Sequence, residues 1–271
     1  MHRLFMFGVD CRAVRIAILQ AVFLALNALS PMMAAAQPVL AFSPQRVLMG
    51  DQDRTATLSL TNRGDAPGTY RIGMSDVLYH EDGTVSHTDM TPVGFPSAKP
   101  FIRFSPRQVR LRPGETQRIR ILARTPDTVS GEYRVHAVLR RLPEPQAASA
   151  QESEGAVSGV VGISQAVALA IILRRGEITA HGGFRDVRRG DKTLDMNLWR
   201  EGNGSLYVDL HAYRGAAEAA NEITVVRGIA VPVPNRILRY RIGLQDAMAG
   251  PIRVTMTDHY TGEVIDSVLV D

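Results

Sequence analysis

The sequence predicts an all-β protein made of two β-sandwich domains that follow an export signal. Three observations predict it: short stretches in which apolar and polar residues alternate, Gly- and Pro-rich turns between those stretches, and no long stretch with helical periodicity. Of the 271 residues, 45% are hydrophobic and 21% are charged. That composition is typical of a globular chain and excludes one that is wholly disordered.

The first 36 residues have the features of a secretory signal. Three arginines precede the apolar run Ile16–Leu29, and the small residues Ala34 and Ala36 follow it at the spacing that signal peptidase requires. The run is shorter than the ~20 residues that span a bilayer, although an uncleaved anchor is the alternative. We therefore expect export and cleavage before Gln37.

Removal of that signal changes the charge and the cysteine count. The chain starts from a net charge of +4, and the signal carries three arginines, one aspartate and the single cysteine, Cys11. The remaining 235 residues have a charge of +2 and no cysteine, which leaves no disulfide and no Cys-based zinc site. Core burial alone must stabilise such a chain, and its charge is too small to favour nucleic acid as a partner.

The first expected domain covers residues 37–175. Its strands are expected at 39–42, 46–49, 54–61, 70–78, 102–104, 108–111, 117–123 and 133–139. Within them, apolar residues recur at every second position, as in Leu58 and Leu60, or Val135 and Leu139. Many short strands with turn signals at this spacing indicate a β-sandwich.

Residues 143–159 interrupt this pattern. The stretch PEPQAASAQESEGAVSG has almost no large apolar side chain, so we expect a mobile loop there. A linker between domains is the alternative, but the strand that follows looks like part of the first sheet.

The longest alternating stretch is residues 160–175. Its β-branched residues and its alternation favour a strand over a helix, which its alanines would permit. At ~3.3 Å per residue it spans roughly 45 Å, which exceeds the usual strand, so part of it is expected to protrude from its own core. Large side chains occupy the odd positions: Val161, Ile163, Gln165, Val167, Leu169, Ile171 and Leu173.

A second, smaller all-β domain is expected over residues 176–271. Its strands are expected at 194–199, 206–213, 223–229, 238–242, 252–257 and 264–270. The hinge before it, residues 174–177, is short, so the two domains are expected at a fixed angle with a cleft between them.

At these residues the sequence resembles the periplasmic pilus-assembly chaperones of the PapD type. The likeness is carried by LAFSPQRVL at 40–48, LSLTN at 58–62, PFIRFSP at 100–106 and, most specifically, LRPGETQRIRI at 111–121. It covers most of the mature chain, although the second domain matches by pattern more than by motif. The resemblance implies two immunoglobulin-like sandwiches in a boomerang arrangement, a periplasmic location and no cofactor.

The resemblance also implies how such a protein acts. The chaperone lends the last strand of its first domain to a pilus or fimbrial subunit whose own fold lacks that strand, and delivers the subunit to an outer-membrane usher. Strand addition supplies main-chain hydrogen bonds, and alternating side chains fill the subunit's groove. The donor face here would be Val161, Ile163, Gln165 and Val167. A self-capping dimer is a further implied partner state.

Members of the family hold the subunit's terminal carboxylate with two basic residues. Arg46 stands where the arginine of the first strand is expected, and a guanidinium fork matches a carboxylate. On charge pattern alone, Arg46 would be a solvated strand residue. The second basic residue is a lysine in the donor strand, where this chain has Ala170 and no lysine nearby.

No pattern of residues predicts an enzyme. The mature chain has six histidines, none of them in a His-x-His or His-x-x-x-His pair, and it has no nucleophile elbow and no glycine-rich phosphate loop. An immunoglobulin-like structural or adhesive module of a secreted surface assembly is the alternative function. The long strand and the loop before it favour the chaperone.

Overall fold

The protein is described by a computed structural model over residues 37–143, 166–244 and 250–271, and the regular secondary structure in these ranges is almost entirely β-strand. The expected signal segment and residues 144–165 lie outside them. Within the described ranges the only helix is the short 3-10 turn η1 (Ala219–Asn221). No described helix is long and apolar enough to cross a membrane.

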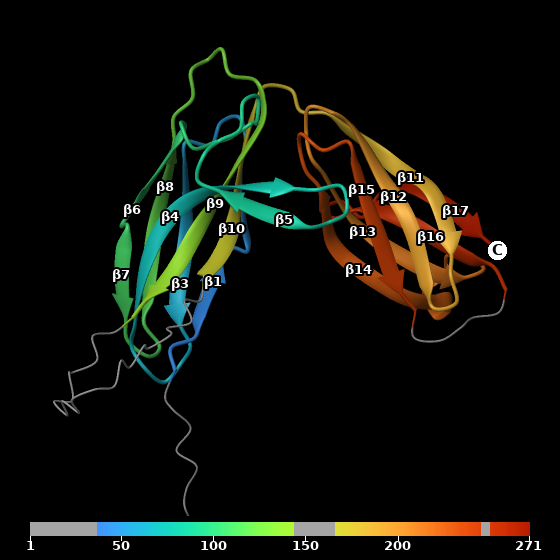
Figure 1. Ribbon diagram of the computed structural model, residues 1–271, viewed down its shortest axis with the longest axis horizontal. Coiled ribbons are helices and arrows are strands. Elements are labelled where there is room, and N and C mark those ends of the chain that lie inside the picture. The colour runs from blue at the N-terminus through green and yellow to red at the C-terminus, as the bar shows by residue number, and fades with distance from the viewer. Residues whose placement is uncertain (1–36, 144–165, 245–249) are drawn as a thin grey trace, which may run out of the picture. The chain divides into compact units, whose positions relative to one another are not determined.

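The first ten strands build a sandwich of two sheets (Figure 1). One sheet has the order β1-β3-β8-β6, and the other has the order β2-β10-β9-β4-β5, with β7 paired to β4. This is the strand order of an immunoglobulin-like sandwich, which confirms the all-β prediction. The strands are β1 (Leu40–Ser43), β2 (Arg46–Met49), β3 (Thr55–Asn62), β4 (Gly68–Tyr79), β5 (Val85–Thr88), β6 (Ile102–Ser105), β7 (Gln108–Leu111), β8 (Thr116–Ala123), β9 (Gly131–Leu142) and β10 (Ala166–Arg175).

The chain crosses from one sheet to the other between β1 and β2. Strand β1 pairs antiparallel with β3, whereas β2 pairs parallel with β10 in the opposite sheet. The peptide bond between Ser43 and Pro44, at the crossing, is cis. Strand β2 starts at Arg46, part of the way along β10.

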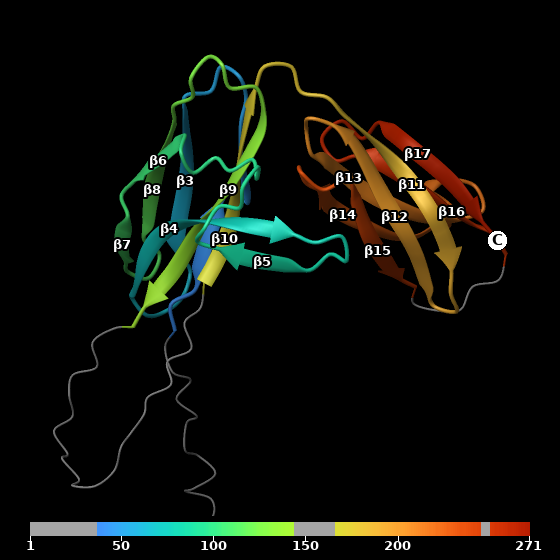
Figure 2. The ribbon, with the colours of Figure 1, turned by 45° about the horizontal axis from the view of Figure 1, so that its top comes forward.

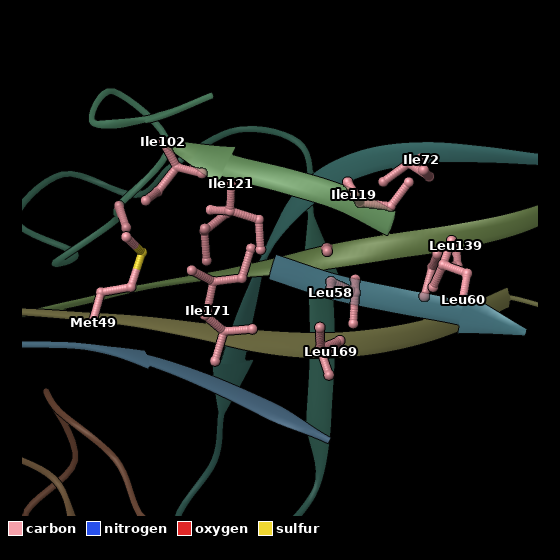
Figure 3. Close-up of a cluster of buried hydrophobic side chains, with 14 of the residues drawn as sticks. Met49, Leu58, Leu60, Ile72, Ile102, Ile119, Ile121, Leu139, Leu169 and Ile171 are labelled. Atoms are coloured by element: carbon pink, nitrogen blue, oxygen red, sulfur yellow. The ribbon is translucent and has the colours of Figure 1, made fainter. Parts of the chain in front are cut away.

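The core of the first sandwich lies between its two sheets. Figure 3 shows side chains of both sheets pointing toward one another, among them Leu58 and Ile121 from one sheet and Ile171 from the other. These three side chains are no more than 1% exposed. The apolar faces predicted from alternation in β3, β8 and β9 are the ones that meet there.

The remaining strands build a second sandwich with its own core (Figure 2). Its sheets have the orders β11-β12-β15 and β14-β13-β16-β17. Residues Pro38–Asp271, which include both sandwiches, form one compact unit. The strands are β11 (Ala180–Arg189), β12 (Thr193–Gly202), β13 (Leu206–Arg214), β14 (Glu222–Val231), β15 (Ile237–Gly243), β16 (Ile252–Asp258) and β17 (Val264–Val270).

The sequence analysis does not predict two of the strands, β5 and β11. Strand β5 is four residues long and carries the polar sequence VSHT. Strand β11 contains a glycine pair and a register shift between Arg185 and Arg188, and Asp186 within it has a φ of 54°. Such a bulge breaks the alternation that identifies a strand.

Candidate functional site

The parallel pairing of β2 with β10 places Arg46 directly opposite Ala170. Ala170 is in turn opposite His136 of β9, and His136 is opposite Ser75 of β4. Residues directly opposite one another in neighbouring strands point to the same face of a sheet. These four residues, which we name the Arg46 row, therefore cross one face of the sheet.

The Arg46 row lies on the sheet face that is turned away from the first core. The next row along the same strands consists of Val47, Ile171 and Val135, which are 3%, 0% and 0% exposed and belong to that core. Because successive side chains of a strand point to opposite faces, the Arg46 row is on the outer face.

The guanidinium group of Arg46 stacks on an aromatic ring. Its central carbon lies 3.6 Å from the centroid of the Tyr207 ring in β13. The Arg46 side chain is half-buried, and among the described residues it forms no hydrogen bond and no ion pair. Its N–H donors are therefore available to an anion such as a carboxylate.

His136 is the neutral neighbour of that charge. It is 4% exposed, its Nε2 lies 3.0 Å from the hydroxyl oxygen of Tyr79, and its Nδ1 has no partner among the described residues. Burial, reinforced by the positive charge of Arg134, lowers the pKa of His136 to about 3. Near pH 7 the imidazole is uncharged, so Arg46 is the charged member of the row.

A buried carboxylate, Glu132, organises the polar groups beside the row. It accepts hydrogen bonds from Arg174 Nε at 3.0 Å, from Arg134 Nη2 at 3.3 Å, and from both the backbone N–H and the hydroxyl of Ser205. Burial raises the pKa of Glu132, but the two guanidinium groups and the bonds from Ser205 outweigh it and hold that pKa below its ordinary value. Ser205 immediately precedes β13, so this network links the two sandwiches.

The two cations at the end of β10 are already occupied. Arg174 is bound to Glu132, and Arg175 donates to the Asp53 carbonyl at 2.9 Å, to the Thr125 hydroxyl at 3.0 Å and to the Gly50 carbonyl. Ala170 contributes only a methyl group to the Arg46 row. Among the described residues of β10, no basic side chain lies beside Arg46 in this row. The resemblance implies a lysine at this position, and this chain has Ala170 there instead.

Strand β10 is paired on both sides along only part of its length. Strand β9 pairs with it from residue 166 to 175, whereas β2 pairs only with residues 170–173. In the part of the chain that the structure describes, no strand pairs with the other edge of residues 166–169. The main-chain groups on that edge therefore have no strand partner among the described residues.

A groove of about 600 Å³ lies beside the same part of β10. Small residues, Gly73, Ala166 and Ala168, line part of it, and the basic residues Arg71 and Arg140 line another part. Ala166 and Ala168 are exposed, because they are on the outer face and β2 does not reach them.

The predicted donor residues are only partly within the described ranges. Val167 is half-buried and lies on the same face of β10 as the core residue Leu169. Val161, Ile163 and Gln165 lie outside the described residues.

Sequence reasoning did not single out Glu132, Arg134, His136 or Tyr207. The first three occupy every second position of β9, opposite the apolar face, and such a polar face is ordinarily solvated. Here it is covered, since all three are 4% exposed or less. The sequence feature that could have revealed this cluster is the presence of a glutamate, an arginine and a histidine on one strand face. Only the fold shows what buries them.

Two of the described histidines have ionic partners, and each has a different one. His211 Nδ1 lies 3.0 Å from Glu222, and His259 Nδ1 lies 2.7 Å from Asp209. Within the described ranges, no group of three or more His, Cys, Asp or Glu side chains is placed to hold a metal ion.

Comparison with known proteins gives structural likenesses only. No protein-family model and no curated protein matches the sequence. The E. coli chaperone DraB is 14% identical, with a TM-score of 0.46 over 86% of this chain and 96% of that chain. The CsuC-CsuE chaperone–tip subunit complex of the Csu pili of Acinetobacter baumannii is 11% identical, with a TM-score of 0.44 and coverages of 86% and 98%. The periplasmic chaperone SfaE is 11% identical, with a TM-score of 0.41 and coverages of 86% and 99%.

Proposed function

We propose that this protein is a periplasmic chaperone of the PapD type that binds a pilus or fimbrial subunit by strand addition. The observation that carries the proposal is the unpaired edge of residues 166–169 in β10, which ends where β2 and Arg46 begin. An open strand edge beside an unpartnered guanidinium suits a partner that offers both a strand and a carboxylate.

The pairing also supports one direction for the incoming strand. Strand β2 runs parallel to β10 and occupies its edge from residue 170 onward. A partner strand that approaches parallel to β10 along residues 166–169 would run in line with β2 and end beside Arg46. Its terminal carboxylate would then meet the Arg46 guanidinium. A strand running the other way would end at the far end of β10, away from that charge.

The same geometry supports the proposed donor residues. If the strand continues before Ala166 without a bulge, Val161, Ile163 and Gln165 share the face of Val167 and Leu169. That face is continuous with the first core, so the partner's groove would be filled by an extension of the chaperone's own apolar face. Gln165 would be the polar member of that series.

The proposal extends to the wider role of the protein. We propose a division into two domains near residue 175, export to the periplasm after loss of residues 1–36, and delivery of the bound subunit to an outer-membrane usher. Shielding a subunit's open edge and apolar groove prevents aggregation and needs no chemical step, so the proposal includes no enzymatic activity.

The test is recovery of a subunit with Arg46→Ala. The full chain would be co-expressed with a small β-rich secreted subunit encoded next to its gene, and the complex purified. Loss of a charge-assisted hydrogen bond pair is expected to weaken binding roughly ten- to a hundredfold and leave the protein folded. Arg185→Ala is the matched control, because Arg185 also stacks on a ring, Trp199, but on the second sandwich. Equal recovery with Arg46→Ala and wild type would overturn the anchor.

A further inference from the structure

Tyr207 presents the face of its ring to Arg46 from the second sandwich. The guanidinium carbon lies 3.6 Å from the ring centroid, the shortest separation among the four cation–ring contacts of the described residues. By comparison, Arg185 lies 4.9 Å from the Trp199 ring. A cation this close to a ring face is attracted by the ring's quadrupole, more strongly when the pair is partly removed from water. Both Arg46 and Tyr207 are half-buried.

Neighbouring groups hold the Tyr207 ring in place. His259 packs edge-on against it, with ring centroids 4.3 Å apart, and Tyr260 lies 5.4 Å away. His259 is itself fixed by Asp209, at 2.7 Å. These contacts hold the ring from within the second sandwich, on the side of His259 and Tyr260.

A glycine makes room for the Tyr207 hydroxyl. Gly228 has a φ of 74°, and a Cβ atom added there would lie 2.8 Å from the Tyr207 hydroxyl oxygen. The Gly228 N–H donates to Asp209 at 2.8 Å, which ties this turn to the carboxylate that holds His259. A residue with a Cβ atom at position 228 would therefore collide with the Tyr207 side chain.

Stacking of this kind orders a guanidinium without using its donors. The ring occupies one face of the planar group, and the N–H bonds lie in the plane, pointing away from the ring. The long arginine side chain otherwise loses considerable rotamer freedom when it binds a ligand. A guanidinium already held on a ring loses less, and so binds a carboxylate more tightly.

We propose that Tyr207 is the positioning residue of the Arg46 anchor. Its ring holds the guanidinium in the plane in which the N–H fork meets the terminal carboxylate of the partner strand. The second sandwich thereby contributes to recognition of a group that only the first sandwich binds. This inference rests on the proposed function, because it takes the ligand of Arg46 to be that carboxylate.

The experiment compares two substitutions of Tyr207 with two forms of one peptide. The probe is a synthetic peptide of the last strand of the co-purified subunit, with a free C-terminal carboxylate or with an amide, and its affinity for the full chain is measured by calorimetry. Wild type is expected to prefer the carboxylate at least tenfold. Tyr207→Phe keeps the ring face and is expected to stay within about twofold of wild type, whereas Tyr207→Leu loses about three- to thirtyfold for the carboxylate only.

Two further variants separate positioning from general damage. In the Arg46→Ala background, Tyr207→Leu is expected to cost nothing more, because the ring acts through the guanidinium. Trp199→Leu, which removes the ring under Arg185, is expected to leave both peptide affinities unchanged.

The results that would contradict these expectations distinguish the positioning role of Tyr207 from the proposed function. If Arg46→Ala loses the preference for the carboxylate but Tyr207→Leu keeps it, the positioning role is wrong and the proposed function stands. An additive loss in the double variant also overturns the positioning role. If wild type shows no preference for the carboxylate, the anchor and the role of Tyr207 both fail.

Discussion

At the scale of single residues, the outer face of β9 differs from an ordinary solvated strand face. His136 is buried beside Arg134, and its Nδ1 is unpartnered among the described residues. Burial and the neighbouring positive charge keep the imidazole neutral in the folded protein, and its pKa falls from 6.5 to about 3. Such a histidine makes folding stability depend on pH, because the unfolded chain binds a proton that the folded chain excludes.

The sign of that dependence is fixed by the direction of the shift. The unfolded histidine takes up its proton near pH 6.5 and the folded one only near pH 3, so the contribution to stability is complete above pH 6.5 and is lost as the pH falls toward 3. The free energy of unfolding is therefore expected to drop by about 2 kcal/mol more between pH 7 and pH 5 than it does in His136→Gln. Urea unfolding at the two pH values measures this difference.

The control for this prediction is an exposed histidine. His80, whose Nε2 lies 3.0 Å from the Ser86 hydroxyl oxygen, is on the surface, and His80→Gln is expected to keep the wild-type pH dependence. If His136→Gln retains the full wild-type slope, the buried neutral imidazole is not its source.

At the scale of elements, β10 serves two purposes along its length. Over residues 170–173 it lies between β9 and β2, and before residue 170 no described strand pairs with one of its edges. The burial of its side chains also differs between these two parts of the strand. Ile171 is fully buried in the first core, whereas Ala166 and Ala168 are exposed.

Two substitutions on the odd-numbered face of this stretch are expected to separate folding from binding. Ile171→Ala removes buried methyl and methylene groups and is expected to lower the free energy of unfolding by about 2–5 kcal/mol. Ile163→Asp is expected to leave stability within about 0.5 kcal/mol and to weaken subunit binding, because a carboxylate enters the partner's apolar groove. Denaturant unfolding and calorimetric binding measure the two effects.

The matched control is Val85→Asp, on the exposed strand β5, where Val85 is 53% exposed. It is expected to change neither stability nor binding. Unchanged binding with Ile163→Asp would show that the donor register is different from the one proposed.

The elements differ in how far the sequence could predict them. Alternation sufficed for β3, β8 and the predicted face of β9, because one face of each is apolar and buried. It failed for β11, where a bulge breaks the period, and for β5, which is short and polar. The pairing of Arg46 with Ala170 could be anticipated only through the resemblance, since no local pattern shows which strands become neighbours.

At the scale of the whole molecule, the described contacts between the two sandwiches are largely polar. Glu132 binds Ser205 and two arginines, and Arg46 stacks on Tyr207. None of these partners could be predicted from the sequence. Most of the pairs join residues more than 30 positions apart, and the charged residues among them have the pattern of ordinary surface charges. A buried ion network of this kind fixes geometry more than it adds stability.

Breaking that network is expected to be costly. Glu132→Ala leaves Arg134 buried without its carboxylate, and removal of one partner of a buried ion pair lowers the free energy of unfolding by about 3–5 kcal/mol. Ser205→Ala removes a neutral hydroxyl and is expected to cost about 1–3 kcal/mol. Thermal and urea unfolding measure which variant loses more free energy of unfolding. A smaller loss for Glu132→Ala than for Ser205→Ala would contradict the network's role.

The most direct test of strand addition is disulfide trapping of the partner strand. The mature chain is expected to have no cysteine, so Ala166→Cys and Ala168→Cys would each carry a single thiol on the open part of β10. Each variant would be oxidised with subunits that carry one cysteine at successive positions of their last strand, since neighbouring strands bring Cα atoms within disulfide range. The account predicts that residue 168 traps a position nearer the subunit's C-terminus than residue 166 does. The reverse order, or no trapping at either residue, would contradict it.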